Sequence, residues 1–411
     1  MEKEKICFLY KHIVMGGAET LILRLGEWYA LHNYEVEIIC KSIEKEIEYS
    51  LIEKNIVIKK LTIFSEKEYT KTISNKNQNK KILFIAFGFY DYFLTEKIRN
   101  KNKNLKISNL WYVVHPFHTR IEKSLIFFAK PVLKKTIINL YNSNRIFFMD
   151  EDCIRITEEY YKINLDNSYK KIIRLPLFIN KQQIIKNKQK NFLNILSIAR
   201  FEFPFKGYLI GLIKEFNKLN QNNNFLKLTI VGDGKGMIEI KKIISKLPLE
   251  TQKNIYIEGI VPYEKLEYYF EDADIYIGMG TTVLDACNHM VPALTVCSYT
   301  YEFLTIGFFY ENPQILAGFY KPNSTVYKSG ADLVKNVLEM ENSDYQKLCI
   351  ENYKAFSDIY DINNNAPKFL EIITNKEKSV QNRVVMDIFL IIRKTIELLR
   401  ILKKKGKETP K

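Results

Sequence analysis

The sequence predicts an α/β protein with two domains, each built on a parallel sheet. Apolar runs of strand length alternate with helical patterns along most of the chain, as in βαβ units. A Lys-, Gln- and Asn-rich run at 181–190 interrupts this alternation, and the same pattern then restarts. The length of 411 residues also exceeds one ordinary core. We expect an N-terminal domain over 1–180, a second domain over 191–365, and helices with a basic tail over 366–411.

Composition indicates which classes of partner the protein could bind and which cellular compartment it occupies. The net charge of +15 favours phosphate-bearing partners, namely nucleic acid, nucleotides or an anionic membrane surface, although a codon bias toward Lys, Asn and Ile gives the same excess. The six cysteines form no CxxC motif, which favours a reducing compartment without structural zinc. The charged start lacks a signal-peptide core, and no apolar run is long enough to span a membrane. We therefore expect a cytoplasmic protein.

In the N-terminal half, a glycine pair follows the first expected strand, at 6–10. Gly16-Gly17-Ala18-Glu19 comes before a helical pattern that runs to Ala30. Glycines at a helix start let a phosphate approach the backbone, although this is not the GxGxxG spacing of a dinucleotide turn. Gly16 and Gly17 are therefore either ligand contacts or only a tight turn. Further strands are expected at 35–40, 56–61, 81–87, 109–115 and 145–149.

Two histidines lie at the end of the strand expected at 109–115. Pro116 keeps His115 out of helical geometry and so ends that strand. A histidine at the carboxyl edge of a sheet can donate a hydrogen bond to a sugar or act as an acid or base. The alternative is a histidine that only supports a turn. We take His115 as a candidate catalytic residue, ahead of His118.

The helical pattern at 123–141 has one apolar side and carries several lysines on the other. Such a helix packs its apolar stripe on the core, or it rests on anionic lipid headgroups. The same alternatives hold for the pattern at 379–405, which ends in three lysines and either packs against the first domain or docks on an anionic cytoplasmic leaflet.

In the C-terminal half, two cations stand between a strand and a helix. The apolar run 192–199 ends at Arg200, and Lys206 comes just before a helical pattern at 208–219. Ligands of open α/β sheets bind at this edge, and helix N-termini favour anions. Arg200 and Lys206 are therefore either the cations of a diphosphate site or solvated charges beside a turn.

The strand ends that follow also carry glycines. Gly232-Asp233-Gly234 follows the strand at 225–231, Gly259-Ile260-Val261 follows 255–258, and a glycine-rich turn ending at Gly280 follows 274–277. Thr281 and Thr282 then open a helix, which they can cap or where they can bind phosphate. Asp285, one turn inside, can accept hydrogen bonds from ribose hydroxyls or simply favour the helix dipole. The recurrence is harder to explain by packing alone.

Together these residues resemble a known family. The segments 197–207, 228–234, 257–259, 273–276 and 284–286 occur in order and at familiar intervals. They resemble the donor-binding domain of GT-B glycosyltransferases, especially the large retaining family four. Gly16-Gly17-Ala18-Glu19 resembles the amino-terminal glycine loop of that family. The resemblance covers 5–313, most of the chain.

The resemblance implies a GT-B fold, with two Rossmann-like domains, a nucleotide-sugar in the cleft between them and C-terminal helices crossing back. It implies that Arg200 and Lys206 neutralise the departing diphosphate without a metal, and the sequence has no convincing DxD motif. No cofactor is implied, because the nucleotide-sugar is a substrate. The implied donor-binding residues are Gly16, Gly17, Gly232, Asp233, Gly234, Gly259, Val261, Gly280, Thr281, Thr282 and Asp285.

Two departures from the family pattern concern its paired glutamates. Asp285 stands at the place of the second, ribose-binding glutamate and is one methylene shorter. The first glutamate, eight residues earlier, falls on Ile277, which cannot take that role. Alternatively the loop is shorter than usual, and Gly278-Met279-Gly280-Thr281-Thr282 replaces it.

Three functions follow, in order of preference. The first is a retaining glycosyltransferase that moves a sugar from a nucleotide diphosphate to a glycan or lipid-linked acceptor, in bacterial surface-polysaccharide synthesis such as capsule or O-antigen. Its place would be the cytoplasm or the inner face of the membrane. The second is a non-catalytic GT-B partner subunit that stabilises an active transferase, an idea motivated by Ile277. Nucleic-acid binding ranks last, because the basic residues are spread along the chain.

Overall fold

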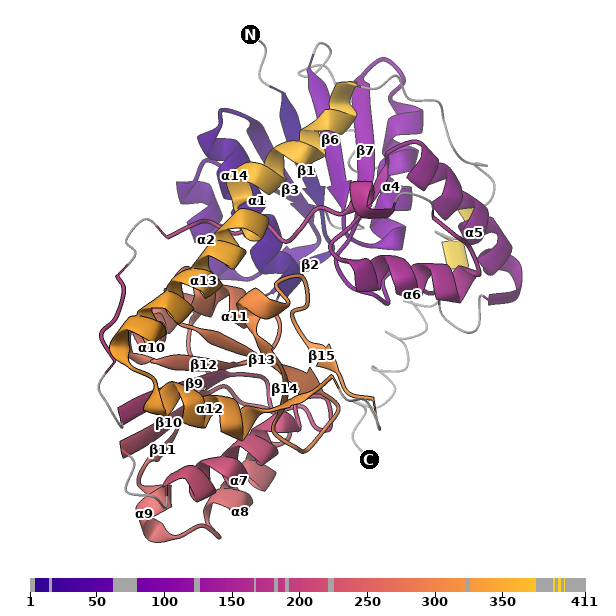
Figure 1. Cartoon of the computed structure of the whole chain (residues 1–411). Coiled ribbons are helices and arrows are strands. Elements are labelled where there is room, and N and C mark those ends of the chain that lie inside the picture. Colours follow the sequence, from indigo (N-terminus) through magenta and orange to yellow (C-terminus); the bar gives the residue numbers. More distant parts are fainter. Residues whose placement is uncertain are drawn as a thin grey trace, which may run out of the picture. The chain divides into compact units, whose positions relative to one another are not determined.

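The computed structural model consists of two compact α/β units. It describes residues 4–14, 17–61, 80–121, 126–165, 168–180, 184–188, 192–220, 225–321, 326–374, 387–388, 391–392 and 395. Unit 1 comprises Met1–Phe178 and Ile362–Lys411, and unit 2 comprises Ile179–Asp361. Figure 1 shows a sheet flanked by helices in each unit. The prediction of two α/β units with parallel sheets is confirmed.

The described part of unit 1 holds a six-stranded parallel sheet in the order β5-β3-β1-β6-β7-β8. Numbered along the chain, this is the strand order 3-2-1-4-5-6 of a Rossmann sheet, which reverses between β1 and β6. The strands are β1 (Lys5–Leu9), β3 (Glu35–Cys40), β5 (Val57–Lys60), β6 (Lys81–Ala86), β7 (Lys106–Val113) and β8 (Ile146–Phe148), beside the short pair β2 (His12–Ile13) and β4 (Ser42–Ile43). The helices are α1 (Gly17–Leu31), α2 (Lys45–Glu53), α4 (Phe89–Lys101), α5 (Ile126–Asn142), α6 (Glu151–Tyr161) and the 3-10 turn η2 (Ser168–Lys171).

Helix α5 occupies the basic amphipathic pattern expected at 123–141. Leu133, Ile137 and Leu140 on this helix are fully buried in the core of unit 1. The apolar stripe is therefore covered by protein, which is the first of the two alternatives that the sequence left open. Among the described residues, no helix is long and apolar enough to span a membrane.

The chain returns to unit 1 after residue 361. Helix α14 (Ile362–Asn365) and the 3-10 segment η5 (Ala366–Thr374) pack on α1 and the sheet. The Trp28 indole N–H donates to Asn363 Oδ1 at 2.9 Å, and the Tyr29 hydroxyl donates to the Ala366 carbonyl oxygen at 2.9 Å. These bonds hold the returning segment on α1. Most of the helix expected at 379–405, including its basic end, lies outside the described residues.

Unit 2 has a second sheet with the same kind of reversal. Its strands lie in the order β11-β10-β9-β12-β13-β14-β16, with β15 paired to β13, and the order reverses between β9 and β12. The strands are β9 (Phe192–Ile198), β10 (Phe225–Val231), β11 (Ile255–Gly259), β12 (Ile275–Gly278), β13 (Ala293–Ser298), β14 (Leu304–Phe308), β15 (Gly318–Phe319) and β16 (Lys328–Ser329). Strands β9 to β13 are parallel, and the antiparallel β14 and β16 extend the edge.

Helices cover both faces of the sheet in unit 2. They are α7 (Tyr208–Asn220), α8 (Met237–Ile244), α9 (Leu249–Gln252), η3 (Tyr263–Lys265), α10 (Leu266–Asp272), α11 (Thr281–Asn288), η4 (Phe309–Glu311), α12 (Gly330–Glu339) and α13 (Asn342–Tyr360). Figure 1 shows α7 and α8 on one face and α10 and α11 on the other. Right-handed crossovers explain this, because the helices change face where the strand order reverses.

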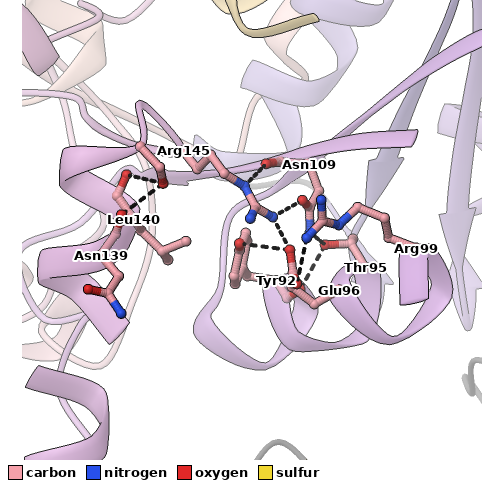
Figure 2. A network of polar contacts seen from close by, with 9 residues as sticks. Tyr92, Thr95, Glu96, Arg99, Asn109, Asn139, Leu140 and Arg145 are labelled. Atoms are coloured by element: carbon pink, nitrogen blue, oxygen red, sulfur yellow. Dashed lines mark hydrogen bonds and ion pairs between the residues drawn. The ribbon is translucent and has the colours of Figure 1, made fainter. Parts of the chain in front are cut away.

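A buried ion pair fastens α4 to the sheet of unit 1 (Figure 2). Arg145, just before β8, pairs with Glu96 of α4, and their side chains are 1% and 0% exposed. The Arg145 guanidinium also donates to the Asn109 side chain and, from Nε, to the Asn109 carbonyl oxygen at 3.2 Å. Tyr92 donates to Glu96 Oε1 at 3.2 Å, and Arg99 donates to Glu96 Oε2 at 3.2 Å. The buried carboxylate thus has several donors.

We predict that Glu96→Gln lowers the free energy of unfolding by about 3–5 kcal/mol, because it leaves the Arg145 charge buried without its counter-ion. The measurement is urea unfolding with a probe for unit 1. Arg155→Ala is the control, because Arg155 pairs with Asp152 and Glu159 at an exposed site where side chains are 56–59% exposed, and we expect a change below about 1 kcal/mol. Equal decreases in the free energy of unfolding in the two variants would show that the buried Glu96–Arg145 pair does not stabilise unit 1.

Candidate functional site

Four strand ends of unit 2 meet at one edge of its sheet. Because β9, β10, β11 and β12 are parallel neighbours, their carboxyl ends lie on the same side. The Gly232 N–H donates to the Gly259 carbonyl oxygen at 2.7 Å, which joins the ends of β10 and β11. The Phe201 N–H donates to the Asp233 carbonyl oxygen at 2.9 Å, which joins the loops after β9 and β10. The structure thus brings the predicted strand-end residues of unit 2 together.

The glycines after β10 make room for the loop after β9. A Cβ on Gly232 would lie 1.9 Å from the Ala199 carbonyl oxygen, and one on Gly234 would lie 2.7 Å from the Phe201 carbonyl oxygen. Both residues have positive φ angles, of 137° and 153°. The sequence predicted that this turn approaches a nucleotide. In the structure, the packing of the loop after β9 explains why Gly232 and Gly234 have no side chain. Asp233 is exposed, and its carboxylate accepts from the Gly234 N–H at 2.6 Å.

Other glycines at this edge leave open space. No described atom lies within 4 Å of a Cβ built on Gly259, Gly280 or, in unit 1, Gly17. Gly259 and Gly280 also have positive φ angles, of 64° and 82°. A ligand could approach the backbone at these positions. Gly16 lies outside the described residues.

Arg200 and Lys206 differ in their surroundings. The Arg200 side chain is 71% exposed and lies 3.5 Å from Glu202 Oε1. Lys206 is half-buried, and its Nζ lies 5.2 Å from the centre of the Phe205 ring. Burial lowers the pKa of Lys206 to about 8, although Glu202 favours the charged form. The loop therefore holds one solvated cation and one desolvated ammonium that an anion would stabilise.

The start of α11 adds backbone donors after β12, the strand that neighbours β9. Gly280, not a threonine, is the N-cap, and no side chain caps the helix. The Thr282 hydroxyl lies 2.5 Å from the hydroxyl of Tyr276, which in turn donates to the Ile198 carbonyl oxygen at 3.3 Å. Tyr276 therefore bridges the ends of β9 and β12, where the strand order reverses. Thr281 is half-buried at the first position of the helix. An uncapped helix start at a topological switch point is an anion-binding arrangement.

Asp285 is held by a tyrosine from a distant turn. Its side chain is buried, and its Oδ1 accepts a hydrogen bond from the Tyr263 hydroxyl at 3.0 Å. Tyr263 follows the Gly259-Ile260-Val261 turn, so this bond ties that turn to α11. Val261 is half-buried and lines a shallow groove of about 530 Å³ with Ile260, Pro262 and residues of α10. Asp285 and Val261 thus belong to one connected part of the edge.

Ile277 is a core residue. It lies inside β12, opposite Leu294 of β13, and is fully buried. Only Met279 and Gly280 separate β12 from α11. Ile277, buried inside the sheet, presents no group that could take the role of the first family glutamate. Both interpretations, Ile277 at the glutamate position or a shorter loop, leave this place without a carboxylate.

The candidate residues of unit 1 lie at the carboxyl edge of its own sheet. His115 follows β7, is exposed, and its Nδ1 accepts from the Phe117 N–H at 3.2 Å. Desolvation lowers the pKa of His115, opposed by Asp150, and burial lowers that of His118 to about 4. Both rings are therefore mostly neutral near pH 7, and His115 can donate or accept a proton. Tyr10 follows β1, where the strand order of this sheet reverses. Burial, and to a smaller extent the charge of Glu19, raise the pKa of Tyr10 to about 12.

Sequence reasoning missed several tyrosines and phenylalanines at the edge of unit 2. Tyr276 is a lone aromatic in an otherwise aliphatic strand, which was a usable signal. Tyr263 directly follows Pro262 at a helix start, but its contact with Asp285 depends on tertiary packing.

Among the described residues, no group of three His, Cys, Asp or Glu side chains could hold a metal ion.

Comparisons with known proteins identify the fold. The sequence matches no family model and none of the curated proteins. A glycosyltransferase from Rickettsia africae ESF-5 has a TM-score of 0.63 at 15% identity, with 92% of this chain and 100% of that chain covered. Anabaena HepE, solved with UDP and glucose, has a TM-score of 0.60 at 12% identity, with 90% and 99% covered. WaaG, a glycosyltransferase involved in lipopolysaccharide biosynthesis, has a TM-score of 0.51 at 15% identity, with 90% and 100% covered.

These similarities extend over nearly the whole chain and both sheets. The chain therefore has the GT-B fold of solved glycosyltransferases, as its motifs predicted. At these identities the similarity concerns the fold.

We predict that Gly232→Ala destabilises unit 2 more than Gly259→Ala does. Both changes force a side chain into a positive-φ conformation, which costs about 1–2 kcal/mol. Only Gly232→Ala also drives a methyl group into the Ala199 carbonyl oxygen, for about 1–3 kcal/mol more. Thermal unfolding followed by a probe for unit 2 measures the difference. A Gly259→Ala variant that melts at the lower temperature would contradict the packing role of Gly232.

Proposed function

We propose that this protein is a glycosyltransferase that moves a sugar from a nucleotide diphosphate to a saccharide or lipid-linked acceptor. The observation that carries the proposal is the edge of unit 2. Arg200 and Lys206 lie there in the loop after β9, and the neighbouring strand β12 is followed by α11, a helix that begins without a side-chain cap. Two cations and a helix start suit a diphosphate. The fold supports the same conclusion, because Anabaena HepE was solved with UDP and glucose.

In this proposal, positively charged side chains of the protein stabilise the departing diphosphate. The bond between the sugar C1 and the diphosphate oxygen breaks, and its electron pair leaves with the diphosphate. Lys206 and Arg200 neutralise the growing negative charge, and the α11 backbone N–H groups donate to the phosphate oxygens, without need of a metal. An acceptor hydroxyl oxygen forms the new bond to C1, and its proton passes to an oxygen of the departing diphosphate. We propose retention at C1 and a hexosyl group, following the family resemblance.

The remaining candidate residues have supporting roles in the same proposal. Asp285, oriented by Tyr263, would accept hydrogen bonds from the ribose hydroxyls. The backbone from Gly259 to Val261 would meet the base, and Gly17 would allow close approach at the start of α1. His115 would contact the sugar or carry a proton, because its ring is mostly neutral near pH 7.

The pathway belongs to the same proposal. WaaG, a structure of the same fold, acts in lipopolysaccharide biosynthesis. We propose synthesis of a bacterial surface polysaccharide such as capsule or O-antigen for this chain. The net charge of +15 supports work in the cytoplasm at the anionic inner face of the membrane.

One observation favours a second candidate, a non-catalytic partner subunit of an active transferase. The loop between β12 and α11 lacks a carboxylate, and Ile277 is buried in the sheet. A protein that binds a nucleotide without turning over a donor would fit this arrangement. Turnover by the isolated chain separates the two candidates.

We predict that the purified chain releases nucleoside diphosphate from one member of a nucleotide-sugar panel, and that Lys206→Ala lowers kcat about 100- to 1000-fold, since one charge-stabilising group is lost. Coupled detection of the released diphosphate measures the rate, with and without EDTA. Lys214→Ala, an exposed lysine of α7, is the control and should keep the rate. If the chain binds donors without turnover, it is the partner subunit; if it binds none, the glycosyltransferase proposal fails.

We also predict that affinity for the bound diphosphate falls as the pH rises above about 8. The charged form of Lys206 predominates below its pKa of about 8 and is lost above it, and the phosphate charge is complete throughout this range. Calorimetric titrations from pH 7 to 9.5 measure the effect. Lys206→Arg is the matched variant, because arginine keeps its charge, and its affinity should be flat over the same range. A wild-type profile as flat as that of Lys206→Arg would remove Lys206 from the anion site.

A further inference from the structure

Three exposed aromatic rings lie in a row at the edge of unit 2. Phe205, Tyr299 and Phe319 are 37%, 49% and 63% exposed. The Phe205 and Tyr299 ring centres are 5.2 Å apart, and those of Tyr299 and Phe319 are 5.6 Å apart. We call these three residues the aromatic strip. A contiguous exposed apolar patch of this kind on a protein surface is often a binding site.

The strip is built from three separate segments. Phe205 is in the loop after β9, Tyr299 follows β13, and Phe319 is in β15, which pairs in parallel with β13. The Tyr299 N–H donates to the Phe205 carbonyl oxygen at 3.2 Å, so backbone contacts hold the first two rings in place. The fold therefore positions the strip.

Tyr299 occupies its place at a conformational cost. Its φ of 59° is in the left-handed region, which bulky residues rarely adopt. Glycine or asparagine would fit this turn without that strain. Backbone strain of this kind is typical of functional sites. The turn by itself therefore does not account for a tyrosine at this position.

The strip begins at the proposed diphosphate site. Lys206 Nζ lies 5.2 Å from the centre of the Phe205 ring, and the two residues are adjacent in the same loop. The strand order β11-β10-β9-β12-β13 then gives a direction along the edge. In the proposed function the base lies at the end of β11 and the diphosphate at the ends of β9 and β12. The next position along this line, at the end of β13, is where the sugar of the donor would lie.

We propose that the aromatic strip binds the sugar that is transferred, by stacking against the C–H face of its ring. The negative face of an aromatic ring attracts the weakly positive C–H groups of a pyranose, while the sugar hydroxyls stay in water. This inference rests on the proposed function and assigns the sugar subsite within it. A second copy of the chain is a poor occupant. At 37–63% exposure, three side chains of about 150–250 Å² each offer about 200–400 Å², less than the roughly 500 Å² per partner that a specific interface of about 1,000 Å² needs.

The test measures how much the sugar adds to binding. A thermal-shift panel of nucleoside diphosphates and their sugar conjugates first finds the pair that binds best. Calorimetry then gives the ratio of the Kd of that diphosphate to the Kd of its sugar conjugate, which isolates the contribution of the sugar. We expect Tyr299→Gly and Phe319→Ala each to reduce this ratio about threefold to tenfold, with the Kd of the diphosphate unchanged.

The variants are chosen so that unfolding cannot imitate the result. Tyr299→Gly relieves the left-handed strain, so its melting temperature should not fall. Tyr310→Ala is the matched control, because Tyr310 is 37% exposed in η4 of the same unit and is not part of the strip. It should leave the ratio unchanged.

Each outcome decides between the proposals. A panel in which nothing binds defeats the proposed function, and this inference with it. A diphosphate that binds normally with an unchanged ratio in both strip variants defeats this inference alone. If the strip variants instead dissociate a dimer, as seen by light scattering, with the ratio unchanged, the strip is a contact between copies and the inference is wrong.

Discussion

The candidate site depends on the absence of a side chain at two positions, Gly232 and Gly234. Without them, the segment from Ala199 to Phe203 lies directly against the turn after β10, and the Phe201 and Gly236 N–H groups donate across this contact at 2.9 Å each. Farther along the same loop, a Cβ on Gly207 would lie 2.5 Å from the Thr300 carbonyl oxygen. The loop that carries Arg200 and Lys206 is thus held at both ends by close backbone packing. A desolvated lysine keeps a defined position there, because the backbone beneath it cannot move without a clash.

The reversal in strand order explains why such a loop is useful. In unit 2 the strand order reverses between β9 and β12, so α7 and α11 leave on opposite faces, on either side of the gap between the two strand ends. The Tyr276 hydroxyl bridges that gap at the level of the backbone. Cations from one side and backbone donors from the other can therefore meet above it. Unit 1 has the same reversal between β1 and β6, with Tyr10 at the end of the first of these strands.

Much of this could be predicted from the sequence, and the failures have physical causes. The buried parallel strands are continuous apolar runs, and β10 has the bounds that its pattern predicts, Phe225–Val231. The short strands β14, β15 and β16 were missed, because they lie at a sheet edge or carry glycine and polar residues. The glycines after the strands were found, but the packing of Gly232 and Gly234 against the loop after β9 was not predicted. Whether a glycine makes room for a ligand or for Ala199 depends on how two loops pack, and a local pattern carries no such information.

The loss of a carboxylate and the presence of exposed rings have one explanation. The loop between β12 and α11 consists of Met279 and Gly280 and carries no carboxylate. In the proposed function, the contacts to the sugar therefore differ from those of the family that this chain resembles. In that proposal the sugar is held by other means, and stacking needs no particular hydroxyl pattern. Tyr299, although its φ of 59° is strained, offers an apolar ring that contacts Phe205, and the Phe205 ring in turn lies beside Lys206.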